Sequence, residues 1–148
     1  MGGFARRVLL WIGAGVVLLV GIIMSVGVIP VVAVDPLAAP GTAIPSFWSN
    51  VIANVLVGTI MLVAVLGLNA RRGVETALLG LAGIGAFVLG LFLLDTAFAF
   101  VNGGSALQSV VVALFACAGA DMLAGMLAVV ETVLRVRLRE REHWINLT

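Results

Sequence analysis

Long apolar stretches alternate with short polar breaks along the chain. Uncharged runs cover residues 8–34, 36–70, 76–94 and 96–120, and each meets or exceeds the ~18 residues that mark a candidate bilayer-spanning helix. Pro40, Gly41 and Pro45 give the start of the second run the composition of a loop. The pattern therefore predicts an all-α membrane protein with four transmembrane helices, over residues 8–34, 51–69, 74–101 and 106–134.

The segments outside these helices are short. An outer loop is expected over residues 35–50, a turn after Asn102, and a charged cytoplasmic tail over residues 135–148. Too little chain lies outside the apolar segments to form a soluble domain, so we expect a single membrane domain over residues 1–148. Interfacial aromatic side chains are expected at the outer membrane surface, at Phe47, Trp48, Phe98 and Phe100.

The placement of arginine predicts how the helices are oriented. All the basic residues apart from one histidine are arginines, and they precede the first helix, separate the second from the third, or follow the fourth: Arg6, Arg7, Arg71, Arg72, Arg135, Arg137, Arg139 and Arg141. Such residues favour the cytoplasmic side. We therefore expect two tandem hairpins in an up-down-up-down bundle, with both termini cytoplasmic and the arginines as inner-surface anchors. The absence of lysine is typical of a GC-rich prokaryotic genome, which indicates a prokaryotic plasma (inner) membrane.

Composition excludes several functions. The chain is 63% hydrophobic and 10% charged with a net charge of +1, so no positive excess indicates nucleic-acid binding. One cysteine, Cys117, and one histidine, His143, cannot form a metal cluster or a pair of haem ligands. No nucleophile–base pair or phosphate-binding glycine loop occurs, so we expect no catalytic residues, no metal, no cofactor and no enzyme activity.

Asp121 carries the strongest functional signal. It lies fourteen residues before Arg135, which is about 21 Å along a helix and well inside a hydrocarbon core of about 30 Å. A carboxyl group there costs at least ~2.5–3.5 kcal/mol and is a functional candidate by default. Asn54 lies at similar depth and is the expected neighbour. Asp121 could be a structural polar clasp, a proton or cation site, or a contact to another subunit.

Two other acidic residues are expected at the membrane surfaces. Glu131 lies one helical turn before Arg135, which indicates an i,i+4 ion pair. Asp95 lies about 34 Å along a helix from Arg72, at the depth of the outer headgroups. Neither residue is assigned a catalytic role.

Small residues recur at helical spacing on the third and fourth predicted helices. Transmembrane helices associate through close packing of small residues, so these faces are expected either to pack inside the bundle or to bind a partner subunit. They comprise Gly80, Gly83, Ala86, Gly90, Ala113, Cys117, Ala120, Ala124 and Ala128.

The two halves of the chain share a pattern. Asn54 precedes Gly58 by four residues as Asp121 precedes Gly125, and an arginine follows each polar residue at a similar distance. A parallel repeat, related by an axis along the membrane normal, and chance similarity between apolar sequences are both open interpretations.

The chain resembles small prokaryotic four-helix membrane proteins of uncharacterised function, including those built from SPW-type repeats. The residues that carry this resemblance are Trp48, Asn50, Asn54, Gly58, Asp121 and Gly125. The similarity covers the second and fourth predicted helices, although neither half contains Ser-Pro-Trp itself. The resemblance implies a four-helix membrane fold and no particular activity.

These features favour a noncatalytic small membrane subunit or assembly factor. It would pack, through small-residue helix faces, against a larger membrane complex or copies of itself within the lipid bilayer. One alternative is a small transporter or ion- or proton-conducting oligomer that uses Asp121, and another is a lipid- or quinone-binding subunit of a membrane enzyme. Water access to Asp121 would favour transport, whereas dry surroundings with an outward glycine face would favour docking.

Overall fold

The computed structural model is almost entirely helical over the residues it describes, which are 3–34, 43–67, 72–103 and 107–145. Its elements are α1 (Gly3–Ile23), the π-helical turn η1 (Met24–Val28), α2 (Ile29–Val34), α3 (Ala43–Leu66), α4 (Arg72–Asn102) and α5 (Gln108–Ile145). Since α1, η1 and α2 follow one another without a break, these residues form four helices long and apolar enough to cross a membrane. The predicted all-α class and the number of long apolar helices are confirmed.

Pro30 explains the π-helical turn in the first of these helices. Proline has no N–H group, and its ring collides with the carbonyl group four residues earlier in a regular α-helix. In η1, which ends two residues before Pro30, the backbone widens and the N–H group of Ile29 donates to the carbonyl oxygen of Met24, five residues back. The wider turn lets the helix continue past the proline to Val34.

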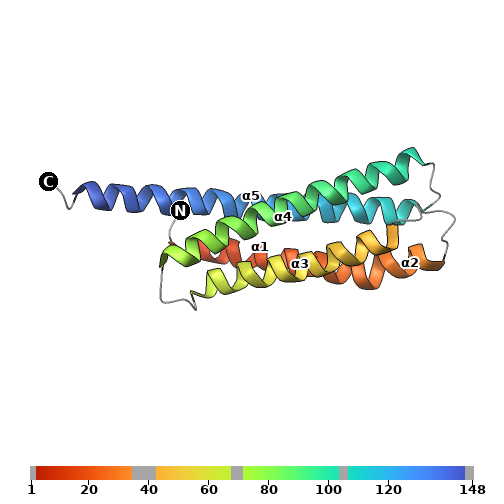
Figure 1. Cartoon of the computed structure of the whole chain (residues 1–148), viewed down its shortest axis with the longest axis horizontal. Helices are drawn as coiled ribbons and strands as arrows, with labels where there is room; N and C mark the ends of the chain where they lie inside the picture. The colour runs from red at the N-terminus through yellow and green to blue at the C-terminus, as the bar shows by residue number, and fades with distance from the viewer. Residues whose placement is uncertain (1–2, 35–42, 68–71, 104–106, 146–148) are drawn as a thin grey trace.

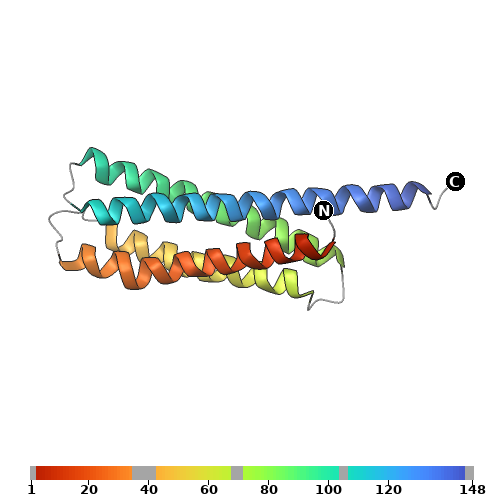
Figure 2. The ribbon, with the colours of Figure 1, turned by 180° about the vertical axis from the view of Figure 1, so that it is seen from behind.

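Helices that are neighbours in sequence lie side by side. α1 packs on α3, α3 on α4, α4 most extensively on α5, and α5 on α1, which closes the ring. The chain direction alternates from each helix to the next (Figure 1). The start of α1 and the end of α5 lie at the same end of the bundle, and α5 extends beyond the other helices there (Figures 1 and 2). We call this end, which carries Arg6 and Arg135, the arginine end.

Two segments predicted to lie outside the helices are helical. α3 begins at Ala43, so residues 43–50 are not loop. Pro45 is compatible with helix because it lies in the first turn, where its missing N–H group has no intrahelical partner. α5 continues to Ile145 instead of ending at Leu134, because arginine and glutamate are good helix formers and the membrane helix has already nucleated the structure.

Buried apolar side chains form two separate clusters. One lies away from the arginine end and includes Met24, Phe47 and Phe100, whereas the other lies toward it and includes Met61 and Leu79. The rings of Phe47 and Phe100 stack at a centroid distance of 6.1 Å and are buried. Their prediction as interfacial residues is therefore wrong, because they close the core from inside.

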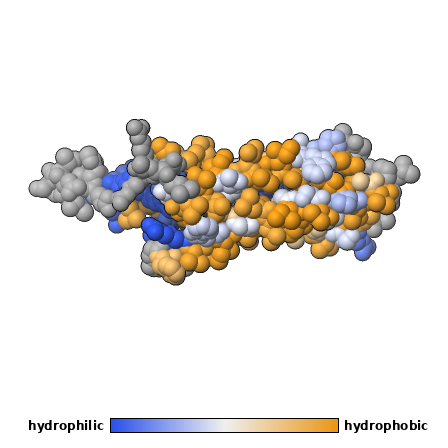
Figure 3. Space-filling model, turned by 90° about the horizontal axis from the view of Figure 1, so that it is seen from below, coloured by the Kyte–Doolittle hydropathy of each residue, from blue (hydrophilic) through white to orange (hydrophobic). Residues whose placement is uncertain are grey.

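Apolar side chains also cover the outside of all four long helices. Examples are Leu19, Ile52, Leu81 and Leu123, all more than half exposed. Figure 3 shows hydrophobic residues along the length of one face, with the densest hydrophilic patch toward the arginine end. An apolar surface of this extent in a soluble protein would be an aggregation liability, so the structure supports a membrane protein.

Candidate functional site

The candidate site lies where the two apolar clusters meet. Asp121 is fully buried, and along α5 it lies between Ala118 of one cluster and Ala124 of the other. It is thirteen residues from the start of α5, which corresponds to about 20 Å. Asn54 on α3 is also fully buried, and its side chain lies beside the Asp121 carboxyl group. The structure thus brings together the two intramembrane polar residues that sequence analysis singled out.

Asn50 is a third member of this group. It is 2% exposed and lies one turn before Asn54 on α3. The Nδ2 atom of Asn54 donates to the backbone oxygen of Asn50 at 3.2 Å and to its Oδ1 atom at 2.8 Å. Sequence analysis missed Asn50 because it placed this residue in the outer loop, although the i,i+4 spacing of two asparagines was a usable signal. We call Asn50, Asn54 and Asp121 the polar layer.

The polar layer contains buried atoms without hydrogen-bond partners. Within the described part of the chain these are both carboxyl oxygens of Asp121, Oδ1 of Asn54 and Nδ2 of Asn50. Buried polar atoms are normally paired, so such exceptions need a physical explanation. Three free oxygen acceptors and one amide donor can hold a proton, a small cation or a water molecule. The layer therefore has binding capacity that the protein's own side chains do not use.

Glycines let the other two helices approach this layer closely. A Cβ atom built on Gly21 of α1 would lie 3.5 Å from Cβ of Asn54, and one built on Gly90 of α4 would lie 2.7 Å from the backbone oxygen of Ala118. All four long helices therefore surround the layer, and Asp121 has no exposed surface.

The small-residue face of α4 lies inside the bundle, against α5. A Cβ atom built on Gly83 would lie 2.8 Å from Cβ of Ala128, and one on Gly80 would lie 3.0 Å from Cγ2 of Thr132. The remaining residues of the predicted faces are buried or partly buried, at Ala86, Gly90, Ala113, Cys117, Ala120 and Ala124. The α4 glycine face is therefore covered by α5, and a partner would have to bind elsewhere.

Gly125 lies at a close approach of α4 and α5. A Cβ atom built on it would lie 2.5 Å from the backbone oxygen of Gly83 and 2.6 Å from the backbone nitrogen of Phe87. Gly58, its counterpart in the possible repeat, lies against Leu18 of α1 at a similar distance. Each glycine thus contacts the long helix that precedes its own in the chain, as corresponding positions of two repeated hairpins would.

Glu131 joins α1 to α5 at the arginine end. Its carboxyl group accepts hydrogen bonds from Nε of Arg6 at 3.0 Å, from Nη2 of Arg6 at 3.4 Å and from Nε of Arg135 at 3.0 Å. The predicted pair with Arg135 is confirmed. The contact with Arg6 links α1 to α5 and was missed, because periodicity along one helix carries no information about a residue 125 positions away.

The other predicted anchors differ in their surroundings. Nη2 of Arg139 donates to Oγ1 of Thr76 on α4 at 3.2 Å. Exposed side chains occur at Arg7, Arg137 and Arg141. Arg71 and the side chain of Arg72 lie outside the described part of the structure.

No family model, curated protein or solved structure matches the chain. Among the described residues, no group of three or more His, Cys, Asp or Glu side chains is placed to hold a metal ion. Cys117 is a buried free thiol that packs within the apolar cluster away from the arginine end.

Proposed function

We propose that the chain is a small noncatalytic integral membrane subunit or assembly factor that binds a larger membrane complex or further copies of itself. The outward α4 glycine face that would have favoured docking is absent, so the observation that carries this proposal is the apolar outside of the bundle. The α4 glycine face is covered by α5, whereas large apolar side chains cover the outside of all four long helices. Lipid or other membrane helices must cover that outside, so partners bind there and not through the α4 glycines.

To test this proposal, the native membrane is solubilised gently, the protein is purified by an affinity tag on its C-terminus, and the mass of the purified species is determined. We expect a stoichiometric larger complex or a discrete homo-oligomer. Photocrosslinking residues placed singly at Leu81 and Leu123, which are 67% and 65% exposed, should then form protein adducts on the contacting face. Recovery of a monomer, with crosslinks only to lipid, would overturn the proposal.

We further propose that the arginine end faces the cytoplasm of a prokaryotic cell, with both termini inside and the helices arranged as two tandem hairpins in an up-down-up-down bundle. The gathering of Arg6, Arg135 and Arg139 at this end supports the proposal through the positive-inside rule. In a Cys117→Ala background, an impermeant thiol reagent should label Asn102→Cys in right-side-out vesicles and Arg141→Cys only in inverted ones. The reverse pattern would contradict this orientation.

A second candidate function is transport of a proton or small cation through Asp121. The unpartnered atoms of the polar layer favour it specifically, since an intramembrane carboxyl group commonly marks an ion path. Because Asp121 is fully buried, transport requires the helices to separate enough to admit water. One measurement separates the two functions, namely the flux of protons or small cations into proteoliposomes that contain the protein. If Asp121→Asn abolishes this flux and Asp95→Asn preserves it, transport is favoured over a subunit role.

A further inference from the structure

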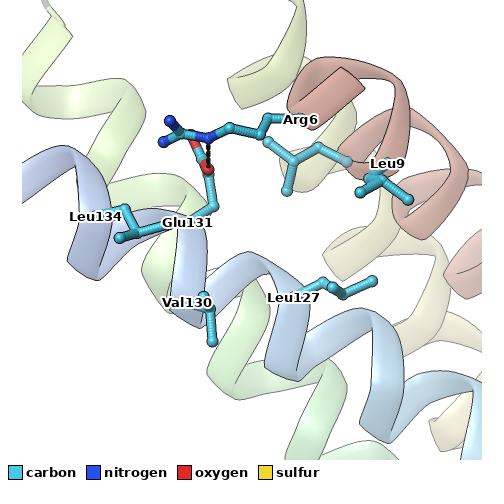
Figure 4. Close-up of a pocket in the computed structure, with 7 residues that line it drawn as sticks. Arg6, Leu9, Leu127, Val130, Glu131 and Leu134 are labelled. Carbon is cyan, nitrogen blue, oxygen red and sulfur yellow. Dashed lines mark hydrogen bonds and ion pairs between the residues drawn. The ribbon is translucent and has the colours of Figure 1, made fainter. Parts of the chain in front are cut away.

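A groove separate from the polar layer runs between α1 and α5 at the arginine end. It has a volume of about 300 Å³, and its apolar lining includes Leu9 of α1 and Leu127, Val130 and Leu134 of α5. Arg6 and Glu131 also line it. Figure 4 shows Arg6 reaching from α1 to Glu131 on α5, beside the apolar side chains.

The groove has charged side chains at the membrane-surface end and apolar side chains further in, which is the order of headgroup and acyl chain in one leaflet of a bilayer. Its charged side chains come from Arg6, near the start of α1, and from Glu131. From Leu134 the lining extends seven residues along α5 to Leu127, which is about 10 Å toward the centre of the bundle. A ligand that fits must therefore have a polar group at the membrane surface and an apolar chain that points into the membrane.

The charge at the mouth of the groove selects among such ligands. Glu131 pairs with Arg6, which also lines the groove, and with Arg135, which does not line it but lies next to Leu134 on α5, so the three side chains together carry a net charge of +1. Each guanidinium group has five N–H donors, and Glu131 accepts from two nitrogens of Arg6 and one of Arg135. Donors thus remain at a site of positive charge, and arginine is well suited to bind phosphate.

We propose that this groove binds one anionic phospholipid from the leaflet at the arginine end. Its phosphate is held by Arg6 and Arg135, and one acyl chain lies along Leu9, Leu127 and Val130. The site goes beyond the proposed subunit role and does not depend on it, because a lipid can bind whether or not a partner protein is present.

The proposal is tested by native mass spectrometry of the full chain, released from detergent and titrated with dioleoyl phosphatidylglycerol or dioleoyl phosphatidylcholine. One basic residue near an anionic lipid contributes enough to change affinity about fivefold. We therefore expect the first phosphatidylglycerol to bind about fivefold more tightly than phosphatidylcholine. Arg6→Gln should remove this preference, whereas Glu131→Gln should increase it because the net charge of the site rises to +2.

A matched pair of variants tests the acyl-chain part of the site without changing charge. Val130→Trp fills the groove and should weaken binding of both lipids, whereas Val112→Trp, at a 67% exposed position near the other end of α5, should not. Equal binding of the two lipids by the unmodified chain, or equal behaviour of the two tryptophan variants, would overturn the proposal. Binding that inorganic phosphate displaces and that Val130→Trp leaves unchanged would identify a bare anion site and would also overturn it.

Discussion

Replacement of Gly125 by alanine is expected to destabilise the bundle by about 1–3 kcal/mol, the usual cost of overpacking a well-packed interior. The added Cβ atom would lie 2.5 Å from the backbone oxygen of Gly83 and 2.6 Å from the backbone nitrogen of Phe87. Backbone atoms cannot move aside by a change of rotamer, so α4 and α5 must separate along their contact. Close packing is a main source of helix association in lipid, so this separation removes much of what holds the pair together.

Gly119→Ala is the matched control, because it makes the same chemical change on the same helix. No heavy atom lies within 4 Å of the Cβ position of Gly119, so the substitution should be neutral or should stabilise the helix by up to about 1 kcal/mol. Unfolding in mixed micelles with increasing dodecyl sulfate, followed by tryptophan fluorescence, measures both variants. Equal midpoints for the two would contradict the close approach at Gly125.

Asp121→Asn is expected to stabilise the bundle by about 1–3 kcal/mol, the cost of leaving a buried polar group unsatisfied. The two side chains have the same shape, but the amide replaces one unpartnered carboxyl oxygen of Asp121 with an NH2 group that carries two donors, and Oδ1 of Asn54 is an unpartnered acceptor in the same layer. A half turn of either amide exchanges its oxygen and nitrogen, so the new side chain can donate to Oδ1 of Asn54. The same unfolding measurement reports the change.

The control for this substitution is Asp95→Asn on α4, where the carboxyl-bearing residue is exposed and the expected change is within about 0.5 kcal/mol. The sign of the Asp121 result separates the roles that its position allows. If Asp121→Asn stabilises the bundle, the carboxyl group lowers the stability of the native protein. A residue that is retained for binding or for contact with a partner, and not for stability, would behave in this way. Destabilisation of Asp121→Asn would instead mean that the acid holds α5 to α3 as a structural clasp.

The number of long helices and the matching levels of Asp121 and Asn54 could be predicted because both depend on distance along one helix. Asp121 and Asn54 were each measured from an arginine near a helix end, and the 1.5 Å rise per residue made the two depths comparable. The structure then places their side chains next to each other. Asn50 was missed because the composition around Pro45 indicates a loop, whereas a proline in the first turn is compatible with helix.

The direction in which a face points could not be predicted from the same information. Phe47 and Phe100 are aromatic residues near the ends of membrane helices, as interfacial residues often are, but their rings stack inside the core. The stripe from Gly80 to Gly90 was compatible with a contact inside the chain or with a partner, because small side chains permit close approach to any helix. Only the positions of the neighbouring helices decide such cases, as they also do for the Arg6–Glu131 pair.

The contact between Gly83 and Gly125 has a mechanical consequence for α5. This helix is continuous from Gln108 to Ile145, and Gly125 divides it into arms of about 26 Å and 30 Å. A rigid rotation of α5 by roughly 5° about this contact would move the two ends of the helix by about 2–3 Å in opposite directions. Contacts on both sides of Gly125, of Thr132 with Gly80 and of Ala118 with Gly90, oppose that rotation and hold α5 in place along its length.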